Sequence, residues 1–82
     1  MKLTGTVTVH GGERAKSAVV EVLNASGDVV DQVQVDDGGR YLYHLSEGIW
    51  TLRVWDAHGH RGRAQVQLDD EDKVVDLELD EG

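Results

Sequence analysis

Apolar and polar residues alternate along most of this 82-residue chain, and that alternation is what most restricts its possible folds. Around Val7 and Val9, for example, threonines occupy the intervening positions. A period of two places successive side chains on opposite faces of an extended strand, one face in the core and one in water. No useful window shows the 3.6-residue period of an amphipathic helix. We therefore predict an all-β fold.

Seven segments carry the alternation, and the breaks between them are rich in glycine, aspartate and asparagine. Their spacing of about 8–12 residues is typical of a β-sandwich. The sequence predicts a seven-stranded antiparallel Greek-key β-sandwich, similar to transthyretin and immunoglobulin domains, with Trp50 in its core. The expected strands are residues 3–9, 18–22, 29–35, 41–43, 50–54, 64–68 and 75–79.

The length of the chain is enough for one domain only, so residues 1–82 are expected to form a single unit with a frayed acidic end at residues 80–82. The chain has no cysteine, which excludes disulfides, thiol nucleophiles and cysteine-rich metal sites. Neither a signal peptide nor an apolar run of membrane-spanning length is visible. The compartment is left open: cytoplasmic, or extracellular if the domain is cut from a larger protein.

The net charge of −8 limits the partners that we expect. Binding to a nucleic-acid backbone needs clustered Lys or Arg, and so does binding to an anionic membrane. The charge therefore argues against nucleic acid and membrane as partners. It also favours a soluble monomer, because like charges keep small β domains apart.

Four stretches of sequence, taken in order, resemble a known family. They are GTV at residues 5–7, AVVEV at 18–22, DGGRYLY at 37–43 and LSEGIWTLRV at 45–54. Together they resemble the carboxypeptidase regulatory-like domains, which are similar in fold to transthyretin and to the collagen-binding B-type repeats of surface proteins. The family often has proline where Lys16 and Ser46 stand here. The resemblance implies a seven-stranded sandwich with a non-catalytic accessory role, and no particular ligand.

Catalytic groups are not arranged in any motif that we can identify. Ser17, Ser26 and Ser46 each lack a histidine at a motif spacing, and the chain has no G-x-S-x-G elbow. Its many carboxylates fall in turns or on solvated faces, where nothing raises their pKa for general acid catalysis. We expect that the protein is not an enzyme and needs no cofactor.

Two clusters could bind a metal ion. His58 and His60 have a His-x-His spacing that can hold zinc or copper in an extended segment, and His10 or His44 could join them. The acidic run at residues 69–72 offers oxygen ligands suited to calcium, without the spacing of an EF-hand loop. For both clusters, a solvated loop or turn is the competing interpretation.

One grouping combines basic and aromatic side chains. Trp55 is out of phase with the inward residues of its strand, so the alternation points its indole away from the core. An exposed tryptophan beside arginines can stack on a sugar ring or anchor a protein partner, or it can simply cover the end of the sandwich. The predicted ligand surface consists of Trp55, Arg53, Arg61 and Arg63.

These observations favour a non-catalytic accessory interaction or spacer module, which presents loops or a strand edge to a fused domain or a protein partner. The loops expected to make contact are residues 10–14, 36–39 and 58–62. Two alternatives stay open: a carbohydrate-binding module that uses Trp55 and the arginines, and weak metal binding at His58 and His60.

Overall fold

The computed structural model describes residues 1–9 and 12–81, which are built from strands and turns without a helix. The prediction of an all-β fold is confirmed. Within the described residues, no helix is long and apolar enough to cross a membrane. The strands are β1 (Lys2–Val9), β2 (Val19–Leu23), β3 (Val29–Gln34), β4 (Arg40–His44), β5 (Gly48–Trp55), β6 (His60–Leu68), β7 (Lys73–Val74) and β8 (Leu77–Glu81).

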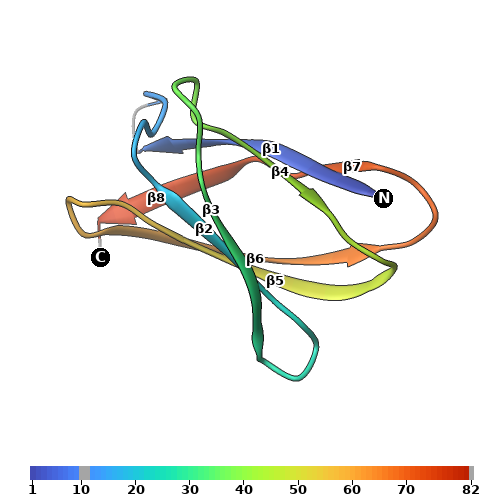
Figure 1. The fold of residues 1–82 in the computed structure, drawn as a ribbon. Coiled ribbons are helices and arrows are strands. Elements are labelled where there is room, and N and C mark those ends of the chain that lie inside the picture. The colour runs from blue at the N-terminus through green and yellow to red at the C-terminus, as the bar shows by residue number, and fades with distance from the viewer. Residues whose placement is uncertain (10–11, 82) are drawn as a thin grey trace.

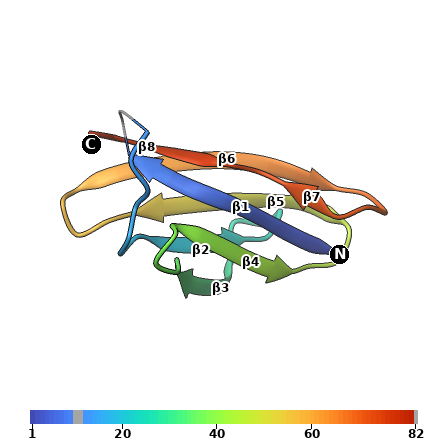
Figure 2. The same ribbon diagram turned by 90° about the horizontal axis from the view of Figure 1, so that it is seen from above.

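The strands form one hydrogen-bonded path in the order β3-β2-β5-β6-β8-β1-β4, with β7 also paired to β1. The path curls until the sheet is nearly closed into a barrel (Figures 1 and 2). In Figure 1, β1, β4 and β7 lie above β5 and β6, and β8 joins the two layers. The two ends of the path, β3 and β4, each keep one edge without a strand partner among the described residues.

The end of the chain differs from the expected pattern. In place of the single strand expected at residues 75–79, the structure has β7, which ends before residue 75, and β8, which begins at Leu77. Both pair with β1 in parallel, so the described fold has eight strands and is not wholly antiparallel. The interruption has a local cause at Gly5, where a Cβ would lie 1.8 Å from the carbonyl oxygen of Val75. The backbone N–H of Val75 donates to the Thr4 carbonyl (2.8 Å), and Asp76 Oδ1 accepts from the N–H of Thr6 (2.9 Å). The Asp76 side chain thus takes the place of a ladder hydrogen bond here, while the register with β1 is the same for β7 and β8.

Leucine and valine side chains from both layers fill the core. Trp50, which was expected in the core, is only partly buried, and its Nε1 donates to the carbonyl of Ser46 at 3.0 Å. Trp50 stands near the start of β5, where the layers end. Its side chain is therefore on the inward face of the strand but only partly covered by the core. The largest fully buried side chains are Leu3, Leu52, Leu68, Leu79, Val7, Val20, Val22 and Val54.

Three turns share one construction. Asn24, Asp36 and Asp56 each accept, through Oδ1, hydrogen bonds from the backbone N–H groups two and four residues later, at 2.9–3.0 Å. In each turn the residue three positions on is a glycine with positive φ, between +74° and +86°. Glycine is favoured there because a side chain is strained in that conformation. The side-chain oxygen thus replaces the hydrogen bonds that the sheet cannot supply at its ends.

Candidate functional site

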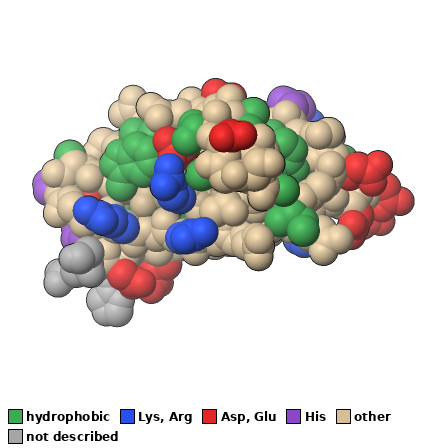
Figure 3. Space-filling model, turned by 90° about the horizontal axis from the view of Figure 1, so that it is seen from below, with side chains coloured by type: hydrophobic (Ala, Val, Ile, Leu, Met, Phe, Trp, Pro, Cys, Tyr) green, Lys and Arg blue, Asp and Glu red, His purple; other side chains and the backbone are tan. Residues whose placement is uncertain are grey.

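The four residues of the predicted ligand surface lie together on the outer face of two neighbouring strands. In the ladder between β5 and β6, Trp55 is opposite Arg61 and Arg53 is opposite Arg63. Since the positions alternate, all four side chains point away from the core. We call these four residues the basic–aromatic face. Figure 3 shows one face of the molecule, with basic side chains beside hydrophobic ones, acidic side chains gathered at one end, and further acidic side chains close to the basic ones.

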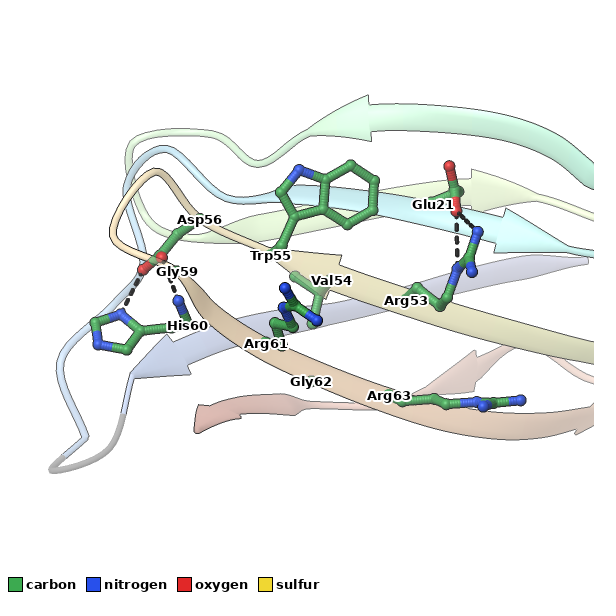
Figure 4. Close-up of a pocket in the computed structure, with 10 residues that line it drawn as sticks. All are labelled: Glu21, Arg53, Val54, Trp55, Asp56, Gly59, His60, Arg61, Gly62 and Arg63. Carbon is green, nitrogen blue, oxygen red and sulfur yellow. Dashed lines mark hydrogen bonds and ion pairs between the residues drawn. The ribbon is translucent and has the colours of Figure 1, made fainter. Parts of the chain in front are cut away.

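A hollow of about 670 Å³ lies over the basic–aromatic face (Figure 4). Trp55 is half-buried at its wall, whereas Arg61 and Arg63 are exposed. The ion pairs of the described residues include neither Arg61 nor Arg63. The hollow is lined by Glu21, Arg53, Val54, Trp55, Asp56, Gly59, His60, Arg61, Gly62 and Arg63.

Glu21 fixes one of the arginines. It faces Arg53 across the ladder between β2 and β5, and its Oε1 accepts from Arg53 Nε at 2.9 Å and also from Nη2. Glu21 is buried, with only 8% of the residue exposed. A buried carboxylate needs such a partner, because desolvation of an unpaired charge is costly. Alternation marks Glu21 as outward but gives no sign of its burial, which depends on Arg53 from a strand far away in the sequence.

Asp56 and His60 form the rim of the hollow where β5 turns into β6. Asp56 Oδ2 lies 2.7 Å from His60 Nδ1, and Asp56 Oδ1 accepts from the backbone N–H groups of His58 and His60. Burial by itself raises the pKa of Asp56, but the hydrogen bonds from His60 and His58 outweigh it, so the pKa is lowered. The carboxylate therefore stays ionised and holds both the turn and the imidazole.

His58 and His60 do not gather further metal ligands in the part of the chain that the structure describes. Their ring centroids are 6.2 Å apart with the planes tilted by 48°, and Nδ1 of His60 is occupied by Asp56. Residues 1–9 and 12–80 contain no group of three or more His, Asp or Glu side chains placed to hold a metal ion. His10 lies outside the described residues. In the acidic run at 69–72, Asp72 instead accepts a hydrogen bond from the backbone N–H of Lys2 at 2.8 Å.

The three loops expected to make contact converge on one end of the molecule. Arg14 Nη1 donates to the carbonyl of Gly38 at 3.2 Å, which joins the first loop to the second. A second hollow, of about 510 Å³, is lined both by Arg14 and by His58 and His60 of the third. Residues 10 and 11 of the first loop lie outside the described residues. The basic–aromatic face begins at this same end, since Asp56 and His60 line both hollows.

The groups around the two hollows include one pair with an arrangement known from catalytic sites. The Asp56–His60 pair has the geometry in which a carboxylate orients an imidazole, as in many general bases. Ser17 lines the second hollow with that pair, but no hydrogen bond of the described residues joins Ser17 to His60. The ten residues around the larger hollow include no serine, threonine, cysteine or lysine that could act as a nucleophile.

The fold and this surface define a small all-β domain with a nearly closed sheet and an outward basic–aromatic face. The chain belongs to the family DUF1416, described as "Protein of unknown function", whose model matches residues 1–80. No curated protein matches the chain. Among solved structures, it is similar to the Bacillus anthracis TIE protein, with a TM-score of 0.74 and 17% sequence identity. The match covers 95% of this chain but only 17% of that protein, and at this identity it shows the fold alone.

Proposed function

We propose that this domain is a non-catalytic interaction module that holds a protein partner, or a neighbouring domain, on its basic–aromatic face. The observation that carries the proposal is the ladder register, which brings Trp55 opposite Arg61 and Arg53 opposite Arg63 beside one hollow. Tryptophan and arginine are enriched among the residues that dominate binding energy at protein interfaces. Two of these side chains are also held in place, because Arg53 is paired with Glu21 on the neighbouring strand and Trp55 is half-buried.

An accessory role of this kind is what the resemblance to carboxypeptidase regulatory-like domains implies. The two layers of strands, joined through β8, are compatible with the Greek-key sandwich of that family. In that setting the module acts as a spacer and a contact surface at once.

The free edge of β3 is a second surface that could serve the same function. Val29 and Val30 are each 51% exposed, and Asp31 is the one charged side chain of β3 that would discourage another strand from pairing with it. An extended segment of a partner could add to this edge by backbone hydrogen bonds. The proposal thus includes strand addition at β3 beside contact at the basic–aromatic face.

Site-specific photo-crosslinking in the source cells tests the proposal. Gln65 is exposed on β6 and points outward with Arg63, so a photoreactive residue at this position should form a discrete protein adduct. Leu42, exposed on β4 in the other layer, is the matched control position. We expect the adduct from position 65 to be lost with Trp55→Ala and to be absent from position 42. Identical adducts from both positions, or an adduct that is indifferent to Trp55→Ala, would contradict the proposal.

The second candidate function is carbohydrate binding on the same four residues. It is favoured by the size of the hollow, about 670 Å³, which is in the range of small-molecule sites, and by an indole at its wall. Trp50→Phe leaves Trp55 as the single fluorescent indole, because the chain has two tryptophans. Titration of this variant with neutral and acidic oligosaccharides should shift the Trp55 emission if a sugar stacks there. An unchanged emission with every sugar would leave the protein-partner proposal alone.

A further inference from the structure

The two arginines of β6 have a fixed spacing. Arg61 and Arg63 are two residues apart on one face of a strand, which separates their Cα atoms by about 7 Å. An extended peptide repeats its side chains on one face at the same distance. Carboxylates at alternate positions of such a peptide would therefore match the two guanidinium groups, each of which can bind a carboxylate in a bidentate pair.

The charge of the face is opposite to that of the rest of the molecule. The chain has eight Lys and Arg against sixteen Asp and Glu, and three of those eight belong to the basic–aromatic face. Arg53 is compensated by Glu21, which leaves Arg61 and Arg63 as the charges available to a ligand. Asp80 lies opposite Arg61 in the ladder between β6 and β8, and no ion pair of the described residues joins them.

Arg61 and Arg63 can attract an acidic ligand although the whole chain is negatively charged, because salt screens the distant carboxylates. The molecule is 33 Å long, whereas at about 0.1 M salt the screening length is about 10 Å. The carboxylates of the 69–72 turn are beyond the far end of the β5–β6 ladder, since Leu68 pairs with Gly48 and Arg61 with Trp55. Salt therefore screens these carboxylates from a ligand at Arg61 and Arg63, whereas the ligand contacts the two arginines directly.

We propose that the partner bound by the basic–aromatic face is an acidic, extended protein segment with carboxylates at alternate positions. Two of its carboxylates pair with Arg61 and Arg63, beside the indole of Trp55 on the same face. The inference rests on the proposed function, because it names the chemistry of the partner on the same surface. It favours a peptide over a sugar because the spacing of the two arginines matches the repeat of an extended backbone.

The test uses three labelled peptides and the Trp50→Phe protein, in which Trp55 reports binding. The first peptide, Glu-Val-Glu-Leu-Glu-Gly, has alternate carboxylates; the second, Glu-Glu-Glu-Val-Leu-Gly, has the same composition in a block; the third replaces each Glu of the first by Gln. We expect the first to bind about fivefold more tightly than either control, from two partly exposed ion pairs. Arg61→Gln with Arg63→Gln should abolish this preference. The matched control, Lys2→Gln with Arg40→Gln, removes the same charge from exposed positions of β1 and β4 and should keep it.

Each of the other outcomes contradicts a defined part of the proposal. Equal binding of the alternating and block peptides overturns the spacing argument, and equal binding of the Gln peptide overturns the charge argument. If a galacturonate oligomer binds more tightly than the first peptide, the partner is an acidic saccharide and not an acidic peptide. If no peptide binds while the photo-adduct at position 65 persists, the acidic segment alone is overturned. If both fail, the interaction module is overturned with it.

Discussion

The turns at Asp36 and Asp56 have the same backbone design and different surroundings. In both, the aspartate accepts two backbone N–H groups and pairs with the side chain four residues later, Arg40 at 3.4 Å or His60 at 2.7 Å. The Asp36 side chain is 53% exposed, whereas that of Asp56 is 6% exposed. The glycines differ in the opposite sense, because Gly39 packs against the backbone of Val7 and Ala15 while Gly59 faces open space.

The difference shows that one local sequence pattern can serve two purposes. At Asp36 the tight part of the turn is its backbone, which docks on β1 through a hydrogen bond from the N–H of Val7 to the carbonyl of Gly39 at 2.7 Å. At Asp56 the tight part is the side chain, which connects the turn to His60 at the rim of the basic–aromatic face. The first turn therefore stabilises the fold, and the second shapes the candidate site.

The largest expected effect comes from the glycines of these turns. At Gly39, φ is +74° and a Cβ would lie 2.7 Å from the carbonyl oxygen of Val7, so Gly39→Ala should lower the free energy of unfolding by about 3 kcal/mol. Gly59 has a φ of +85° and nothing within 4 Å, so Gly59→Ala should cost only about 1 kcal/mol, from the strained φ. Urea unfolding of the two variants measures both values. Equal losses would show that the two turns do not differ in packing as described.

The next effect concerns the aspartates, and here the Asp56 turn is expected to be the more sensitive of the two. Asp56→Ala removes two backbone hydrogen bonds and the His60 contact from a nearly buried site, and should cost about 2 kcal/mol. Asp36→Ala should cost less than half as much, because water replaces its contacts. Asp56→Asn is the matched control, since Asn24 holds the same kind of turn with an amide. If Asp56→Asn is as damaging as Asp56→Ala in urea unfolding, the contact with His60 contributes more to stability than the turn does.

A smaller effect is expected from acid. Both carboxyls have a lowered pKa: at Asp36 mainly through the hydrogen bond from the N–H of Arg40, and at Asp56 through bonds from His60 and His58 that outweigh its burial. A lowered pKa in the folded state contributes stability above the unfolded value of about 3.9, and this contribution is lost as the pH falls through the folded value. The stability advantage of the wild type over Asp56→Asn should therefore shrink below about pH 4. Unfolding midpoints from about pH 6 down to pH 2 measure it, and an advantage independent of pH would contradict the lowered pKa.

The smallest effect separates the two side chains, Arg40 and His60, that contact these aspartates. Arg40→Gln removes an exposed ion pair and should leave the unfolding midpoint unchanged within error. His60→Gln removes a short contact to a nearly buried carboxylate and should cost about 1 kcal/mol. Differential scanning calorimetry of the two variants compares them directly. If Arg40→Gln is the more harmful variant, the two turns differ less than their burial indicates.

Most of the strands could be predicted from the sequence because alternation is a local property. Leu52 and Val54 are in phase and fully buried, and Trp55 is out of phase and turned outward. Alternation assigns a side chain to one face of a strand but does not say how deeply it is buried, which is why Trp50 was expected in the core. Pairing partners are non-local, so the parallel contact of the last strands with β1 had no sign in the pattern.

The basic–aromatic face was predictable as a grouping for a related reason. Its residues belong to consecutive strands joined by one tight turn, so their parity alone places them on the same side. The role of Glu21 depends on a neighbour 32 residues away and could not be found in this way. The shared turn construction was visible as Asn or Asp followed by Gly three positions later, at 24–27, 36–39 and 56–59.

The parallel contact of β8 with β1 has a mechanical consequence. The first strand enters at one end of the long axis and the last strand leaves at the other, as Figure 1 shows. Tension applied to the two termini would pull these neighbours past each other along their length, so the hydrogen bonds between them would bear the load together instead of opening one by one. Such a domain is suited to a position where a chain is stretched, because it would yield only when the whole ladder slides.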